Sequence, residues 1–265
     1  MPDFDYMLKV ASATLHANVL LNDCLVFRHT ETRLREAELK LTPWIVQGHN
    51  RLEVRIEEPG EPALGALRAA GEEVPEPTFV LSGHVVPKIA GQCLDANEFL
   101  RYRWTEGETP LPGAGPATVL KHHWLVQEEF GPWVWESARP FEPQDRAAVV
   151  ALVAQLHALM LARNLNTLEA LLAVKTDELC QAYGFDLTAT RREHMEFLRS
   201  AVSAEDFELD PPRDDKLRLE LDAGGRLVRV LDAEGRPPLL GRANGRPLAY
   251  DLTLSHVDGA WLVVR

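Results

Sequence analysis

Lys175 and Glu178 are the two residues whose types and spacing come closest to those of an acid–base pair. They lie three positions apart in a segment whose leucines, Leu168, Leu171 and Leu172, recur at helical spacing. Lys175 occupies a position of this apolar stripe where a hydrophobic residue is expected. If the pair faces an interior pocket, the desolvated groups have shifted pKa values and can transfer protons. In the alternative that we favour, Lys175 lies at the edge of the stripe and extends its ammonium group into water.

The sequence contains no other recognised catalytic motif. No glycine-rich phosphate loop, serine nucleophile elbow or HExxH or HxH zinc motif occurs. His122 and His123 are adjacent in a predicted strand, so their side chains point to opposite faces and do not easily share a metal ion. Cys24, Cys93 and Cys180 form no CxxC pair. We therefore assign no catalytic residue, metal or cofactor, and we lean towards a protein that is not an enzyme.

The remaining histidines and tryptophans of interest have structural interpretations. His157 and His194 lie on predicted helices, and neither has a carboxylate placed to form a catalytic dyad, so we interpret both as structural. Trp133 and Trp135 lie two residues apart in a predicted strand and share one face, which is typical of a core position. Stacking on a sugar ring, as in a carbohydrate-binding module, is the alternative.

Acidic side chains are concentrated in two segments. The chain carries 28 basic and 40 acidic side chains, a formal net charge of −12. Residues 57–76 and 205–215 each hold six acids and one arginine. This excess argues against nucleic-acid binding, which depends on neutralising phosphates. It fits a surface for a basic protein partner, for which the candidate residues are Glu72, Glu73, Glu76, Asp210, Asp214 and Asp215. The alternative is that both segments are solvated loops.

Residues 1–141 are typical of a β domain. Residues 51–56, RLEVRI, alternate strictly between charged and apolar side chains, which is the period of a half-buried strand. Similar runs recur as far as residues 133–137, and Asn22-Asp23 marks a tight turn. About eight strands without a convincing helix predict an antiparallel β-sandwich.

One segment of this domain carries a family resemblance. Residues 41–54, LTPWIVQGHNRLEV, resemble the hairpin of galactose-binding-like jelly rolls. In this pattern Gly48 takes a positive φ, and the Asn50 side chain bonds back across the turn before the next strand. The resemblance implies a jelly-roll-like fold, and no sugar-binding residue follows from it.

Residues 142–265 change to a helical period. Apolar stripes predict three helices, which begin near Pro143, at Asn166 and near Thr188. Glu169 is expected to complete a capping box with Asn166, and Gly184 to end the second helix. An antiparallel meander follows, in which one strand has an alternating apolar face formed by Leu248, Tyr250, Leu252 and Leu254.

The end of the chain carries a second resemblance. Helices followed by a curved sheet that closes with DGAWLVVR resemble the NTF2-like cone. The resemblance implies an α+β domain over residues 142–265. Lys175 and Glu178 would face the interior of an open cone.

These observations predict an α+β protein of two domains, residues 1–141 and 142–265. No apolar stretch is long enough to predict a membrane span, and the N-terminus does not resemble a secretory signal. We therefore expect a cytoplasmic protein. We interpret its function as non-catalytic protein–protein recognition, most concretely that of a bacterial immunity protein that occludes a basic toxin or effector. The alternative is a small-molecule-binding or hydrolase/isomerase-type NTF2-like enzyme that uses Lys175 and Glu178. The oligomeric state stays open.

Overall fold

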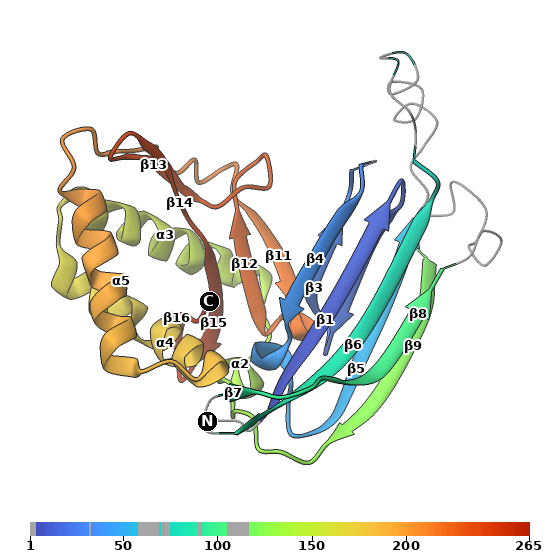
Figure 1. Cartoon of the computed structure of the whole chain (residues 1–265). Coiled ribbons are helices and arrows are strands. Elements are labelled where there is room, and N and C mark those ends of the chain that lie inside the picture. The colour runs from blue at the N-terminus through green and yellow to red at the C-terminus, as the bar shows by residue number, and fades with distance from the viewer. Residues whose placement is uncertain are drawn as a thin grey trace. The chain divides into compact units, whose positions relative to one another are not determined.

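The chain divides into two compact units, Met1–Gly131 and Pro132–Arg265 (Figure 1). The computed structural model describes residues 4–31, 33–57, 69, 71, 75–89, 92–104 and 117–265. Antiparallel sheets occur in both units and long helices in the second, so the fold class is α+β. The boundary expected after residue 141 lies inside the second unit.

The described strands of the first unit form two antiparallel sheets. The elements are β1 (Phe4–Ala13), β2 (His16–Leu21), β3 (Cys24–His29), β4 (Arg35–Lys40), η1 (Thr42–Trp44), β5 (Gly48–Glu57), β6 (Thr78–Ile89), β7 (Gln92–Cys93), β8 (Asn97–Arg103) and β9 (Ala117–Val126). One sheet has the order β4-β1-β6-β7, with β8 also paired to β6, and the other has the order β3-β2-β5-β9.

Alternation along β5 buries the face that the sequence predicts. Leu52, Val54 and Ile56 are at most 1% exposed, because they face the core of the unit. Glu53, expected on the outer face, is buried as well. Its carboxylate accepts a hydrogen bond from Arg55 Nε at 2.6 Å, which compensates for part of the lost hydration.

The hairpin before β5 has the contacts that its sequence predicts. Gly48 has a φ of +93°, a conformation that favours glycine. The Asn50 side chain donates to the Val46 carbonyl at 2.8 Å and accepts from the Val46 N–H at 3.0 Å. Asn22 donates to the Asn50 side-chain oxygen at 2.8 Å, so two turns of the unit are tied together.

The second unit places its helices before two antiparallel sheets. The elements are α2 (Val134–Ser137), η2 (Pro143–Asp145), α3 (Arg146–Leu161), α4 (Leu165–Tyr183), α5 (Leu187–Val202), β10 (Glu208–Leu209), β11 (Arg218–Asp222), η3 (Ala223–Gly225), β12 (Leu227–Leu231), β13 (Leu239–Ala243), β14 (Arg246–Tyr250), β15 (Leu252–Val257) and β16 (Ala260–Val263). The strand orders are β11-β12-β15-β16 and β10-β13-β14. Within the described ranges, no helix has both the length and the apolar character needed to cross a membrane.

Apolar side chains from the helices and from both sheets form one core in this unit. Val153 of α3, Leu198 of α5 and Leu254 of β15 are each at most 1% exposed within it. The helical stripes of the sequence therefore face the strands. This burial is the main source of stability for helices of this length.

Helix α4 begins and ends at identifiable capping residues. Its N-cap is Asn164, whose side chain accepts a hydrogen bond from the Thr167 N–H. The predicted start at Asn166 and its capping box with Glu169 are therefore wrong, because an asparagine two positions earlier already caps the helix. Gly184 ends the helix with a φ of +70°, as predicted.

Residues 133–137 do not form the predicted strand: Val134–Ser137 form the helical turn α2, and Trp133 is its N-cap. Glu136 Oε1 accepts the Trp133 N–H at 2.7 Å, and this local capping contact prevails over the alternating pattern. Trp133 and Trp135 are both 2% exposed, so their rings belong to the core and offer no stacking platform for a sugar. The guanidinium carbons of Arg265 and Arg226 lie 5.7 and 5.5 Å from the two ring centroids.

The single strand expected at residues 248–254 is split at Asp251. The segment before this residue, β14, belongs to one sheet, and the segment after it, β15, belongs to the other. The alternating apolar residues are nevertheless all buried: Leu248, Tyr250, Leu252 and Leu254. The Asp251 carbonyl lies between the two ladders and therefore needs a hydrogen-bond partner from elsewhere.

Candidate functional site

The side chain of Lys175 supplies the hydrogen-bond donor for the Asp251 carbonyl. Its Nζ donates to the Asp251 carbonyl at 2.9 Å and lies 4.3 Å from the centroid of the Tyr250 ring. Burial lowers the pKa of Lys175 from 10.5 to about 8. The ammonium group thus stabilises the point where the chain changes sheets.

Tyr250 connects Lys175 to a chain of hydrogen bonds. Its hydroxyl lies 2.9 Å from His194 Nε2, and His194 Nδ1 lies 3.2 Å from Thr176 Oγ1. Because Thr176 donates its own proton to the Leu172 carbonyl, its oxygen accepts from His194 Nδ1–H. Nε2 then accepts from the Tyr250 hydroxyl. This pattern assigns a neutral imidazole to His194.

The surroundings of His194 keep it neutral. Burial lowers its pKa, and the nearby Lys175 ammonium lowers it further. Burial also raises the pKa of Tyr250. His194 and Thr176 line a groove of about 350 Å³ between α4 and α5. The sequence marked His194 as structural, but it carried no signal for the contact with Tyr250, 56 positions away.

Glu178 has partners of its own. Its Oε1 accepts the Val134 N–H at 2.6 Å, and its Oε2 lies 3.7 Å from Nε of Arg265. Burial raises the pKa of Glu178, while Arg265 and the Val134 hydrogen bond oppose that shift. Among the described residues, no ion pair or hydrogen bond joins Glu178 to Lys175. The side chains of Lys175 and Glu178 therefore contact different residues and do not form a pair.

The candidate partner-binding residues are on the surface where the structure describes them. Glu72 and Glu73 lie outside the described residues. The other four are exposed: Glu76, Asp210, Asp214 and Asp215. The three aspartates share the connection between β10 and β11, and the glutamate precedes β6.

One acid of segment 205–215 has a structural role. Asp206 accepts the N–H groups of Gly245 and Asn244 at 2.7 and 2.8 Å. The hydrogen bond from Gly245, together with that from Asn244, lowers the pKa of Asp206. Asp206 therefore anchors the turn between β13 and β14. No pattern in the sequence indicated this role, because the turn lies far along the chain from Asp206.

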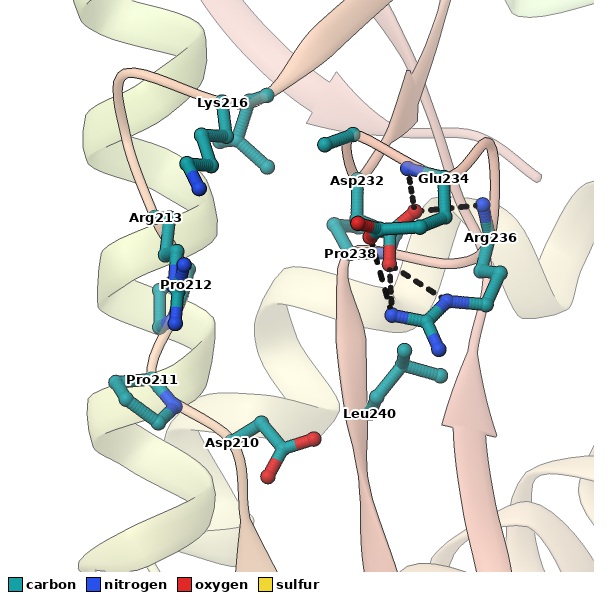
Figure 2. A pocket seen from close by; sticks show the side chains of 12 residues that line it. Asp210, Pro211, Pro212, Arg213, Lys216, Asp232, Glu234, Arg236, Pro238 and Leu240 are labelled. Atoms are coloured by element: carbon teal, nitrogen blue, oxygen red, sulfur yellow. Dashed lines mark hydrogen bonds and ion pairs between the residues drawn. The ribbon is translucent and has the colours of Figure 1, made fainter.

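A cavity of about 410 Å³ lies beside this segment (Figure 2). Residues between 210 and 217 form one wall, residues between 232 and 238 form the other, and Leu240 also lines the cavity. Figure 2 shows Arg213 and Lys216 on the first wall, across from the turn that follows β12. Three acidic and three basic side chains line the cavity, so its charge is balanced in a strongly acidic chain.

Asp232 orders the second wall. Its carboxylate accepts the N–H groups of Glu234 and Arg236 at 2.9 and 2.8 Å and the Arg236 Nε at 2.8 Å. Arg236 also contacts Glu234 Oε2 at 3.2 Å. Burial acts to raise the pKa of Asp232, but these hydrogen bonds lower it overall. Asp232 and Arg236 are thus occupied with each other.

A search for metal ligands and a comparison with known proteins also concern the site. Within the described ranges, no three His, Cys, Asp or Glu side chains lie close enough together to hold a metal ion. Set against known proteins, the chain matches no family model, and no curated protein and no solved structure is significantly similar to it.

Proposed function

We propose that the protein acts by non-catalytic recognition of another protein, and that this partner presents a basic surface to segment 205–215. In its most specific form, the chain is a bacterial immunity protein that occludes a basic toxin or effector in the cytoplasm. The strongest support is the exposure of Asp210, Asp214 and Asp215 on one connection between strands. Their carboxylates make no ion pair or hydrogen bond to the described residues, so they are available to a partner.

The contacts of the other candidate groups favour the same proposal. Lys175 donates a hydrogen bond to a backbone carbonyl, and Glu178 accepts one from a backbone N–H and forms an ion pair with an arginine. Both ring nitrogens of His194 have protein partners. The interior between the helices and the sheets is filled with apolar side chains. These contacts suit a structural role, and they leave the exterior of the unit for recognition.

Electrostatics gives the proposal a measurable consequence. A formal net charge of −12 attracts a basic partner over distances longer than a hydrogen bond and raises the rate of association. Salt screens exposed charges beyond about 8 Å at physiological ionic strength. Association with the true partner is therefore expected to slow as salt concentration rises.

The test is co-expression of the chain with the product of each neighbouring gene, followed by size-exclusion chromatography. For a complex found this way, association rates are measured by stopped flow at low and high salt. The variant D210N/D214N/D215N is expected to slow association about tenfold at low salt, because three exposed charges near the contact are removed. Adding E72Q, E73Q and E76Q tests the candidates of the first unit in the same assay.

A control variant separates local from global charge. E36Q/E193Q/E196Q also removes three exposed acids, but these lie outside segment 205–215. It is expected to slow association less than the aspartate variant does. A complex whose association is insensitive to salt, and equal for the two variants, would contradict recognition through this segment.

The finer fold assignments are part of the proposal. The first unit is proposed to be a jelly-roll-like β-sandwich, which its two antiparallel sheets and the Asn50 hairpin support. The second is proposed to be NTF2-like, which its order of helices followed by antiparallel strands supports. An experimental structure of each unit, compared strand by strand with those folds, tests both.

One observation favours the alternative function, an NTF2-like enzyme. Lys175 has a pKa of about 8, so a fraction of its amine is neutral near physiological pH and can accept a proton. This function requires Lys175 and Glu178 to act on one substrate, whereas they contact different neighbours. It gains support only if a small-molecule turnover is found that both K175M and E178Q abolish.

A further inference from the structure

Two of the three cations that line the cavity beside Asp210 make no ion pair within the described residues. Arg236 is paired with Asp232. The side chains of Arg213 and Lys216 make no ion pair or hydrogen bond with the described residues. The first wall thus carries two cations and one acid, Asp210, so it is locally basic in a strongly acidic chain.

The walls of the cavity are held in place before any ligand arrives. Pro211 and Pro212 restrict the backbone of the first wall, because a proline ring fixes φ. Asp232 binds the backbone of the second wall through two N–H groups. A preformed cavity loses little conformational entropy when it binds a ligand.

The cavity also offers apolar surface. Leu217 and Pro238 are buried and Leu240 is half-buried, and the exposed parts of all three line the cavity. A volume of about 410 Å³ lies within the range that small-molecule sites have. The combination of two cations with an apolar lining fits a ligand that has one anionic end and one apolar end.

We propose that this cavity binds an amphipathic organic carboxylate. The carboxylate lies between Arg213 and Lys216, and the apolar part packs on Leu217, Pro238 and Leu240. The inference does not depend on the protein-recognition proposal, because it uses the cations of the cavity and not the acids of segment 205–215.

Isothermal titration calorimetry of the full chain tests the proposal with three probes. These are 2-naphthoate, the uncharged 2-naphthamide, and inorganic phosphate. We expect 2-naphthoate to bind with a Kd of about 1 mM or tighter, and at least tenfold more tightly than either of the other two. Equal binding of the acid and the amide, or no binding of the acid, overturns the proposal. Equal binding of phosphate overturns the apolar part of it.

Paired variants locate the site. R213Q/K216Q is expected to weaken 2-naphthoate binding at least tenfold. The control R192Q/R199Q removes the same charge from exposed positions of α5 and is expected to leave binding within twofold. All four residues are exposed, so thermal unfolding should be unchanged, and circular dichroism checks this. If R213Q/K216Q leaves the affinity unchanged, the assignment to this cavity is wrong.

Asp210 distinguishes this proposal from protein recognition. Figure 2 shows it at the opposite end of the cavity from Lys216. D210N removes a negative charge, so it is expected to tighten 2-naphthoate binding up to about threefold. The same substitution is expected to weaken a basic protein partner. The two proposals therefore fail independently, and a weaker 2-naphthoate affinity in D210N contradicts the one made here.

Discussion

The hydroxyl of Tyr250 and Nε2 of His194 form a hydrogen bond of 2.9 Å that joins strand β14 to helix α5. The bond selects the tautomer in which Nδ1 carries the proton. Burial and the neighbouring Lys175 then disfavour the imidazolium form, as the lowered pKa of His194 reflects. A histidine held neutral in the native state makes the second unit sensitive to acid.

We expect this acid sensitivity to depend on His194. The pKa of His194 lies below 6.5 in the folded chain and near 6.5 in the unfolded chain. Between these two pKa values the unfolded chain binds the proton and the folded chain does not. The free energy of unfolding therefore falls as pH drops from about 7.5 to 5.5. H194Q, whose amide can both donate and accept, is expected to lose this contribution.

Urea unfolding of the full chain at the two pH values measures the effect. H123Q is the control, because His123 is exposed on β9. It is expected to retain the pH dependence of the wild type. An NMR titration in which His194 protonates at or above 6.5 would contradict the assignment of a neutral imidazole.

Lys175 is expected to give a pH dependence of the same sign as that of His194, but in a more alkaline range. Its pKa is about 8 in the folded chain and about 10.5 when unfolded, so between these values only the unfolded chain holds the proton. The free energy of unfolding of the wild type, measured relative to that of K175M, should therefore rise as pH increases from 8 to 10.5. At pH 7 the two should differ by less than about 1 kcal/mol, because the lost bond to Asp251 offsets the relieved desolvation.

Urea titrations of wild type and K175M across this pH range check the expectation. K216M is the control, since Lys216 is exposed and lacks the contact with Tyr250. A wild-type stability that runs parallel to K175M from pH 8 to 10.5 would show that Lys175 titrates normally.

Glu178 and Arg265 are expected to be energetically coupled. E178Q keeps an oxygen for the Val134 N–H but removes the carboxylate charge beside Arg265, whose side chain is 11% exposed. This should cost about 2–4 kcal/mol of unfolding free energy. In E178Q/R265M the arginine charge is absent as well, so the double variant should recover at least about 1 kcal/mol of the additive loss. Strict additivity in the cycle would mean that the pair does not interact.

Gly83 and Phe99 provide a test of packing in the first unit. A Cβ added at Gly83 would lie 2.6 Å from the Phe99 ring, closer than carbon atoms approach. G83A is expected to lower the free energy of unfolding by about 1–3 kcal/mol. F99L removes the ring atoms that clash, so G83A should be far better tolerated in that background. Urea unfolding of the four proteins measures the coupling, and equal costs in both backgrounds would refute the contact.

The second unit is expected to be more stable when its first ten residues are kept. Within residues 132–141, the Val134 N–H binds Glu178, the Arg139 N–H binds the His256 carbonyl, and the Phe141 N–H binds the Gly225 carbonyl. A fragment of residues 132–265 should therefore unfold cooperatively at a higher temperature than residues 142–265. Calorimetry of the two fragments measures both unfolding temperatures. Equal unfolding temperatures would support a domain boundary after residue 141.

Local patterns in the sequence determined the elements whose cause is also local. The alternation of Leu52, Val54 and Ile56 predicted a buried strand face, because side chains on a strand alternate strictly. Gly184 predicted the end of α4, since few other residues adopt its left-handed conformation. The Asn50 hairpin followed from a side chain that reaches only four positions back.

The tertiary structure decided everything that joins residues far apart in the chain. Lys175 and Glu178 suggested a pair because they are three positions apart, yet their partners are the carbonyl of Asp251 and the side chain of Arg265. The alternation of apolar residues from Leu248 to Leu254 likewise did not indicate that the chain changes sheets at Asp251. Spacing reports which residues share a face of one element, whereas hydrogen-bond partners depend on which elements the hydrophobic core brings together.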